Sequence, residues 1–284
     1  MPTTYLDQNA LIGLGRKARD AEFRKKLDAA LDSGALSVVL SLWHLVETAH
    51  TTKLENAIEL AQFIESVRPA WLFERHDVLR MEIAEAFYGY AHIGYEPVSR
   101  ISTFSAMFAA MNRSADDPRF DIRLDSFVEQ WWNHPDQMEP LDAAYKNNAD
   151  ALTGIRELKK QGKMTDEIKN QARQVLFEHT VPTRTPAGLD VGHAIRAEYI
   201  TRAKEDSIPT LAIEKSISEQ EWDAQGGADR NTLIDKFHVI PALPYVDEII
   251  SDDHFFQSVY PATMKTGYVK AKLIGNKEFL GRFA

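Results

Sequence analysis

The residues best suited to do chemistry are acids that stand beside apolar runs. Residues 233–256, LIDKFHVIPALPYVDEIISDDHFF, place Asp235, Asp247, Asp252 and Asp253 among Ile, Val, Leu and Phe. An ionised carboxylate is costly to remove from water unless a partner or a cation neutralises it. Carboxylates that lie close together raise one another's pKa, and their oxygens suit Mg²⁺ or Mn²⁺. A cluster of such acids would indicate a metal site, and phosphoryl chemistry is a common task of these metals.

Three apolar runs that favour β-strands, residues 3–8, 35–41 and 246–251, end in polar residues. In parallel α/β sheets, ligands bind outside the carboxyl ends of the strands. We therefore expect the polar residues at these strand ends, and the acids on neighbouring helices, to converge at one edge. They are Asp7, Asn9, Ser41, Glu47, Asp235, Ser251, Asp252 and Asp253, with Asp247 as a helper at the start of the last strand.

The elements that must position these residues alternate between strand and helix patterns. Residues 17–34 carry apolar side chains at helical spacing and end on Gly34, a usual helix stop. Helices are also expected over 54–67 and 75–90, with a strand over 69–74 between them. The order strand, helix, strand, helix, helix predicts a parallel sheet with helical crossovers.

The middle of the chain has mostly helical patterns. Helices are predicted within 101–112, 121–132, 141–178 and 190–204, and the Pro- and Thr-rich segment 181–188 separates the last two. The α/β pattern then returns, with a helix over 229–240, strands over 246–251 and 268–274, and a helical turn at the end. We therefore divide the chain into a first core part (1–97), a helical insertion (98–227) and a last core part (228–284).

The composition excludes several classes of function. The chain of 284 residues has no cysteine, so disulfides, thiolate zinc sites and cysteine nucleophiles are ruled out, and a cytoplasmic location is expected. The net charge of −9 argues against a protein that coats nucleic acid by bulk attraction. The longest apolar stretch, residues 35–43, is too short to span a bilayer, so we expect no membrane association.

The motifs in this order resemble those of the PIN-domain nucleases, a family of metal-dependent and mostly RNA-cleaving proteins. YLDQNALI is similar to the first family motif, Asp-x-Asn after a strand, which places the first acid at Asp7. SLWHLVE is similar to the second, in which Glu47 follows Ser41 by six positions. In the last motifs an Asp on a helix precedes a Ser-x-Asp-x-x-Phe stretch by about eighteen residues. Asp235, Ser251, Asp253 and Phe256 fill that pattern.

The resemblance covers residues 1–90 and 228–284, and it implies a three-layer α/β/α core interrupted by the helical block. It further implies an endoribonuclease in which Asp7, Glu47, Asp235 and Asp253 bind one or two Mg²⁺ or Mn²⁺ ions, with Asp252 as a second choice beside Asp253. A metal-bound water would attack phosphorus and leave 5′-phosphate and 3′-hydroxyl ends. The expected partners are an RNA substrate and an inhibitor protein of the antitoxin kind, and an oligomer stays open.

Other interpretations stay open. The same metals could serve a structure-specific DNA nuclease, or the domain could be an inactive module that binds nucleic acid or protein. Asp7 could be a turn residue with Asn9 as the next helix cap, Glu47 and Asp235 could be solvated, and Asp252 could be a helix cap. Two further features are read as structural: the histidines near the acids form no recognised ligand pair, and the paired tryptophans 131–132 anchor local packing.

Overall fold

The computed structural model describes residues 2–112, 123–138, 154, 157–158, 160–221 and 240–284. Its sheet contains six strands in the order β4-β3-β2-β1-β5-β6. The strands are β1 (Thr3–Leu6), β2 (Ser37–Leu40), β3 (Ala70–Leu72), β4 (Ile101–Ser102), β5 (Glu248–Ile250) and β6 (Lys272–Ile274). Only β4 pairs antiparallel, with β3, whereas the other pairs are parallel. The protein is therefore α/β with a mostly parallel sheet, as the sequence predicts.

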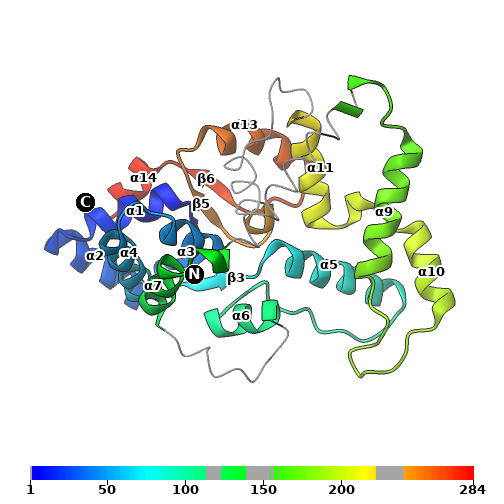
Figure 1. Cartoon of the computed structure of the whole chain (residues 1–284), viewed down its shortest axis with the longest axis horizontal. Helices are drawn as coiled ribbons and strands as arrows, with labels where there is room; N and C mark the ends of the chain where they lie inside the picture. The colour runs from blue at the N-terminus through cyan, green and yellow to red at the C-terminus, as the bar shows by residue number, and fades with distance from the viewer. Residues whose placement is uncertain (1, 113–122, 139–153, 155–156, 159, 222–239) are drawn as a thin grey trace.

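Helices pack on both faces of this sheet, and they gather at the two ends of the molecule. Helices α1, α2, α4, α7 and α14 gather at one end in Figure 1, and α9 to α11 lie at the other. The α-helices are α1 (Gln8–Lys17), α2 (Ala21–Asp32), α3 (Leu42–Ala49), α4 (Leu54–Ser66), α5 (Arg75–Tyr90), α6 (Phe104–Asn112), α7 (Leu124–Asn133), α9 (Asp166–Thr180), α10 (His193–Arg202), α11 (Pro209–Glu221), α13 (His254–Thr263) and α14 (Asn276–Gly281). The short 3₁₀ helices are η2 (Pro135–Met138), η3 (Glu205–Ser207) and η4 (Met264–Thr266). None of the helices in the described ranges is both long and apolar enough to cross a bilayer.

Alternate residues of the strands feed two separate cores. Leu6, Leu40 and Trp71 point into a core that includes α1 to α4, α7 and α14. Their neighbours Tyr5 and Val39 point to the opposite face, where α11, α13 and the segment before β5 pack. Because successive side chains of a strand point to opposite faces, a sheet covered on both sides needs apolar residues at every position. The near-continuous apolar runs in β1 and β2 are explained by this two-sided burial.

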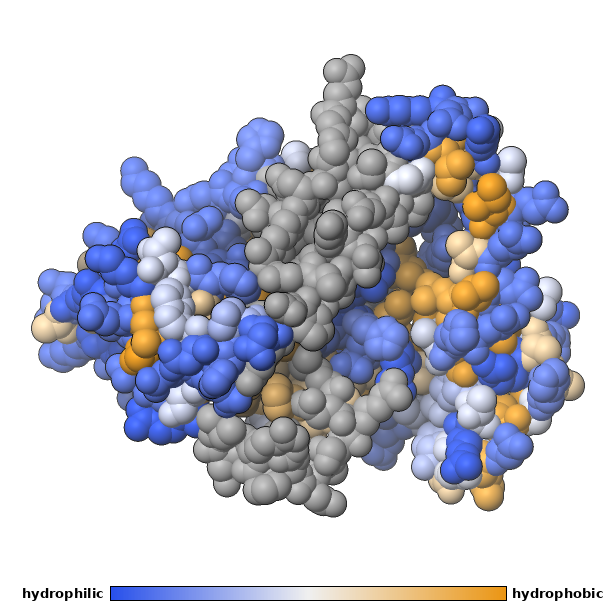
Figure 2. Space-filling model, in the orientation of Figure 1, coloured by the Kyte–Doolittle hydropathy of each residue, from blue (hydrophilic) through white to orange (hydrophobic). Residues whose placement is uncertain are grey.

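A third apolar core lies away from the sheet. The second half of α5 packs there with α9, α10 and the start of α11, through residues such as Phe87, Phe177 and Tyr199. By contrast, β4 joins the sheet, and α6 and α7 contribute Met107 and Phe127 to the first core. The described part of residues 98–227, expected as a helical insertion, is thus divided between the sheet cores and this third core. Figure 2 shows apolar residues gathering over the α9–α11 end, whereas the α1–α4 end is mostly hydrophilic.

Most predicted elements are confirmed, with four differences, one of which is α11 (Pro209–Glu221), a helix that the sequence analysis did not predict. A helix forms over Gln8–Lys17 that the sequence analysis did not predict, and it begins directly after β1. The expected helix over 101–112 begins only at Phe104, because Ile101 and Ser102 pair with β3. The sheet is also not wholly parallel, for the same reason. The predicted helix over 229–240 falls almost entirely outside the described residues.

A carboxylate cluster at the edge of the sheet

Asp7 joins the central strand to the first helix. Its backbone N–H continues the ladder by donating to the Ile250 carbonyl at 3.0 Å, so the residue is fixed beside β5. Its side chain caps α1, with Oδ1 accepting from the Ala10 N–H at 2.6 Å. Asp7 is only 7% exposed, which is unusual for an acid. The cap is made by Asp7 and not by Asn9, which is exposed on the first turn of α1.

Ser41 ends the neighbouring strand and fixes the start of α3. Its backbone N–H donates to His44 Nδ1 at 3.0 Å, and Ser41 and His44 form a reciprocal capping box. Because Nδ1 accepts this hydrogen bond, the proton of the neutral ring is on Nε2, which donates to the Leu6 carbonyl at 2.6 Å. His44 is fully buried. It therefore ties α3 to β1, which confirms the structural interpretation of this histidine.

Three acids lie near enough to Tyr5 at this edge for their charges to raise its pKa. Tyr5 is fully buried, and its hydroxyl lies 3.2 Å from Ser41 Oγ. Burial raises the pKa of Tyr5 well above its ordinary value, and the nearby charges of Glu47, Glu74 and Asp7 raise it further. The hydrogen bond with Ser41 opposes the shift. The predicted meeting of Asp7 with Glu47 is therefore consistent with the structure, because both charges act on the same buried phenol.

Glu74 belongs to this cluster, although the sequence analysis did not select it. It lies two residues after the end of β3 and stands at the N-cap position of α5, so it occupies the same sheet edge as Asp7 and Ser41. Burial raises the pKa of Glu74 to about 8, and Asp77 adds repulsion, while Trp43 and the Leu42 backbone favour the charged form. A carboxyl group with that pKa holds a proton at neutral pH and can act as an acid. The available sequence signal was its position after a predicted strand.

The acids after β5 point in different directions. Ser251 is buried, and its Oγ accepts a hydrogen bond from the Asp253 N–H at 2.9 Å, which shapes the turn into α13. Asp252 is exposed, and its Oδ1 accepts from the Asn276 N–H at 3.0 Å, at the start of α14. Asp252 thus satisfies the first N–H of α14, whose N-cap residue is Gly275. Asp253 is half-buried beside the end of β5.

One predicted residue, Asp247, is not brought to this edge, and the position of another lies outside the described residues. Asp247 lies at the amino end of β5, where its Oδ2 accepts from the backbone N–H and the hydroxyl of Thr3 at 2.7 and 2.9 Å. Lys270 Nζ lies 2.9 Å from its other oxygen. These contacts lower the pKa of Asp247 to about 2, with the Thr3 backbone bond as the largest cause. Asp247 therefore anchors β5 to β1 at the opposite edge and does not support the site, and Asp235 lies outside the described residues.

The side chains at this edge supply oxygen atoms but no arranged set of metal ligands among the described residues. Two oxygens around α3, Gln8 Oε1 and Glu74 Oε1, are buried and accept no hydrogen bond from the described residues. Carboxylate and amide oxygens are the ligands that Mg²⁺ and Mn²⁺ prefer. In their present positions, however, no three Asp, Glu or His side chains of the described residues are arranged to hold an ion. The edge offers suitable oxygens without a complete set of ligands among those residues.

Comparisons with known proteins add no relationship to this geometry. No family model matches the sequence, no curated protein matches it, and no solved structure matches the fold. The function must therefore be argued from the residues at this edge.

Proposed function

We propose that this chain is a metal-dependent endonuclease that hydrolyses RNA phosphodiesters at the carboxyl edge of its sheet. The observation that carries the proposal is the proximity of two acids from different elements. Gln8 Nε2, next to Asp7, donates to Thr48 Oγ1, next to Glu47, at 3.2 Å, and the charges of both acids raise the pKa of the buried Tyr5. Carboxylates that lie close together raise one another's pKa, and a bound cation favours their charged forms. The resemblance of the motifs around these acids to PIN-domain nucleases supports the same conclusion.

In this proposal, Asp7, Glu47 and Asp253 hold Mg²⁺ or Mn²⁺, and Asp235 completes the set. These residues would hold the ion, which when bound would lower the pKa of a water and compensate charge on the phosphoryl group. The remaining residues prepare the site. Ser41 and His44 hold the start of α3 in place, and Glu74 keeps a proton at neutral pH that it can give to a departing oxygen.

We also propose that the sheet and the helices on its two faces form a three-layer PIN-like core, and that the helices of the third core are an insertion. The separation of the third core from the two sheet cores supports this division. The absence of cysteine supports action in the reducing cytoplasm.

The test compares cleavage of end-labelled single-stranded RNA by the wild type, Asp7→Asn and Glu47→Gln. Asp20→Asn is a matched control, because Asp20 caps α2 through the Phe23 N–H as Asp7 caps α1, away from the sheet edge. Asparagine caps helices as well as aspartate does, so both Asp variants should fold. We expect cleavage with Mn²⁺, none with EDTA, and a loss of about 100-fold or more in the two edge variants. Even outer partners of a metal site cost 10- to 100-fold.

Three outcomes would contradict the proposal. Wild-type rates in both edge variants would exclude Asp7 and Glu47 as functional groups. Cleavage of labelled DNA but not RNA would favour the DNA nuclease interpretation. Absence of cleavage together with no Mn²⁺ uptake in calorimetry would favour an inactive binding module.

A further inference from the structure

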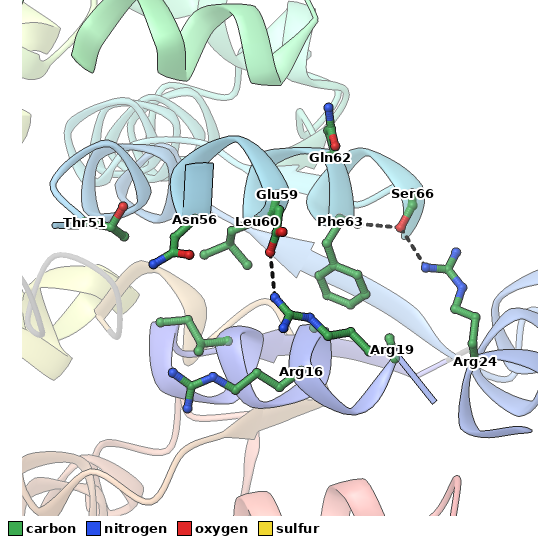
Figure 3. A pocket seen from close by; sticks show the side chains of 13 residues that line it. Arg16, Arg19, Arg24, Thr51, Asn56, Glu59, Leu60, Gln62, Phe63 and Ser66 are labelled. Carbon is green, nitrogen blue, oxygen red and sulfur yellow. Dashed lines mark hydrogen bonds and ion pairs between the residues drawn. The ribbon is translucent and has the colours of Figure 1, made fainter. Parts of the chain in front are cut away.

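A groove with arginines along one wall runs between α1 and α4. Its volume is about 640 Å³, and Figure 3 shows Arg16, Arg19 and Arg24 on one side facing Asn56 and Ser66 of the α4 side. Glu59 is the single acid among the residues that line it. Glu59 pairs with Arg19 and Asp28 pairs with Arg24, so Arg16 gives the groove a local positive charge among the described residues, although the whole chain carries −9. Local charge of this kind marks a site for an anion.

The arginines can be reached by a ligand. Arg16 is exposed and takes part in none of the ion pairs found among the described residues. Arg19 pairs with Glu59 at 2.6 Å, but the two side chains are 72% and 61% exposed. Exposed pairs are worth little, so a phosphate can replace Glu59 at small cost. Arg24 is held between Asp28 and Ser66 and fixes the far end of the groove.

The floor of the groove is apolar and contains an aromatic ring. Phe63 is half-buried, and Figure 3 shows its ring projecting from α4 toward α1. Gly15 makes this approach possible, because a Cβ atom there would lie 3.1 Å from Phe63 Cδ1. Glycine disfavours a helix interior, so its presence in α1 is explained by this packing. An aromatic ring flanked by arginines is typical of surfaces that bind single-stranded nucleic acid, where bases stack on the ring.

The groove continues from the carboxylate edge. Helix α1 begins at the Asp7 cap, and Gln8 Nε2 donates to Thr48 Oγ1 at 3.2 Å, beside Glu47. Thr51, three residues after Thr48, already lines the groove. Arg16 lies nine residues after Asp7, which corresponds to about 14 Å along a helix. A strand of a few nucleotides can therefore span the distance from the edge to the arginines.

We propose that this groove binds the sugar–phosphate backbone of single-stranded RNA and leads it to the carboxylate edge; the inference rests on the function proposed above. A duplex would need a broad basic face, which a chain of net charge −9 does not provide on average. An extended peptide is usually recognised by main-chain hydrogen bonds from a sheet edge. The walls here are helices, whose main-chain groups are already paired within α1 and α4.

The test measures binding in EDTA, so that no cleavage is needed. Fluorescence anisotropy would follow a labelled 12-nucleotide oligouridylate with the wild type, with Arg16→Gln/Arg19→Gln and with a control, Lys169→Gln/Arg202→Gln. The control removes two exposed cations that also have exposed partners, on α9 and α10. We expect the groove variant to bind about tenfold more weakly, and its slope of log K against log salt to fall by about 1.4, or 0.7 per lost phosphate contact. The control should stay within about twofold of the wild type.

A second variant tests the aromatic floor. Phe63→Leu keeps an apolar side chain but removes stacking, so affinity should fall about tenfold with an unchanged salt slope. Equal affinity and slope in the wild type and both groove variants would overturn the proposal, as would no binding by the wild type. Competition by a 12-residue polyglutamate as strong as that by the RNA would overturn it in favour of an acidic peptide.

These results separate the two proposals. RNA binding that depends on the groove, without cleavage when Mn²⁺ is added, supports the groove and refutes the nuclease function. Cleavage that depends on Asp7, with RNA binding unaffected by the groove variants, supports the nuclease and overturns the groove.

Discussion

Replacing Glu74 by Gln should remove a large pH dependence from the stability of this protein. The ordinary pKa of a glutamate is 4.5, and burial raises the pKa of Glu74 to about 8. The folded state therefore holds a proton that the unfolded state releases between these two values. The stabilising effect of that proton is complete below pH 4.5 and is lost as pH rises toward 8. Between pH 5 and pH 9 the loss amounts to about 4 kcal/mol, at 1.36 kcal/mol per pKa unit.

Glutamine has the shape of the protonated glutamic acid but cannot ionise. At pH 5 we therefore expect wild type and Glu74→Gln to have similar free energies of unfolding. At pH 9 the variant should be more stable by about 4 kcal/mol. Urea denaturation at a series of pH values measures the difference directly, and all other titrating groups cancel because they are shared.

Glu278→Gln is a suitable control, since Glu278 is an exposed acid in the first turn of α14. Its pH profile should follow that of the wild type. If Glu74→Gln also loses stability in parallel with the wild type from pH 5 to 9, the raised pKa of Glu74 is refuted.

Three further predictions follow from contacts described by the structure. Glu82→Ala should lower the free energy of unfolding, measured by urea denaturation, by about 3 kcal/mol. The buried Glu82 carboxylate accepts hydrogen bonds from Thr210 N, Thr210 Oγ1 and Tyr245 OH at 2.9, 2.7 and 2.6 Å, and the variant loses all three. A change below about 1 kcal/mol would contradict this. Asp247→Asn should cost about 1 to 2 kcal/mol at pH 7, and the difference should shrink as pH falls from 4 toward 2, since the pKa of Asp247 is lowered to about 2. A constant difference across that range would refute the anchoring role. Mn²⁺ at 100 times its dissociation constant should raise the free energy of unfolding of the wild type by about 2.7 kcal/mol, measured by thermal unfolding, but not that of Asp7→Asn. Equal increases in the two proteins would mean that the ion binds elsewhere.

The strands were predictable because local signals agree. Residues 35–41 combine Val and Leu with a polar end, and β2 forms within them. Helix α1 was not predicted, because Gly13 and Gly15 weaken its helical pattern. The second of these glycines is explained only by Phe63 on another helix. Strand β4 depends in the same way on a partner, since two residues form a strand only beside β3.

The site was predictable in part for a related reason. A strand end can be recognised in sequence, so Asp7, Ser41 and the acids after β5 could be assigned to one edge. The direction of a side chain at that edge depends on neighbours from elsewhere, as with Asp252, which turns to α14. Burial of Glu74 also depends on packing by other elements, and a sequence pattern contains no measure of it.

The central place of β1 has a consequence for the order of assembly. β1 pairs with β2, about 35 residues later, but also with β5, and Thr3 and Asp247 are 244 positions apart. Contacts between such distant segments form late, because the intervening chain must first be ordered. On the ribosome, one side of β1 stays without its strand partner until Glu248–Ile250 have emerged. An unfinished chain therefore lacks half of the sheet edge at which Asp7 lies, because the β5 side of that edge is synthesised more than 240 residues after β1.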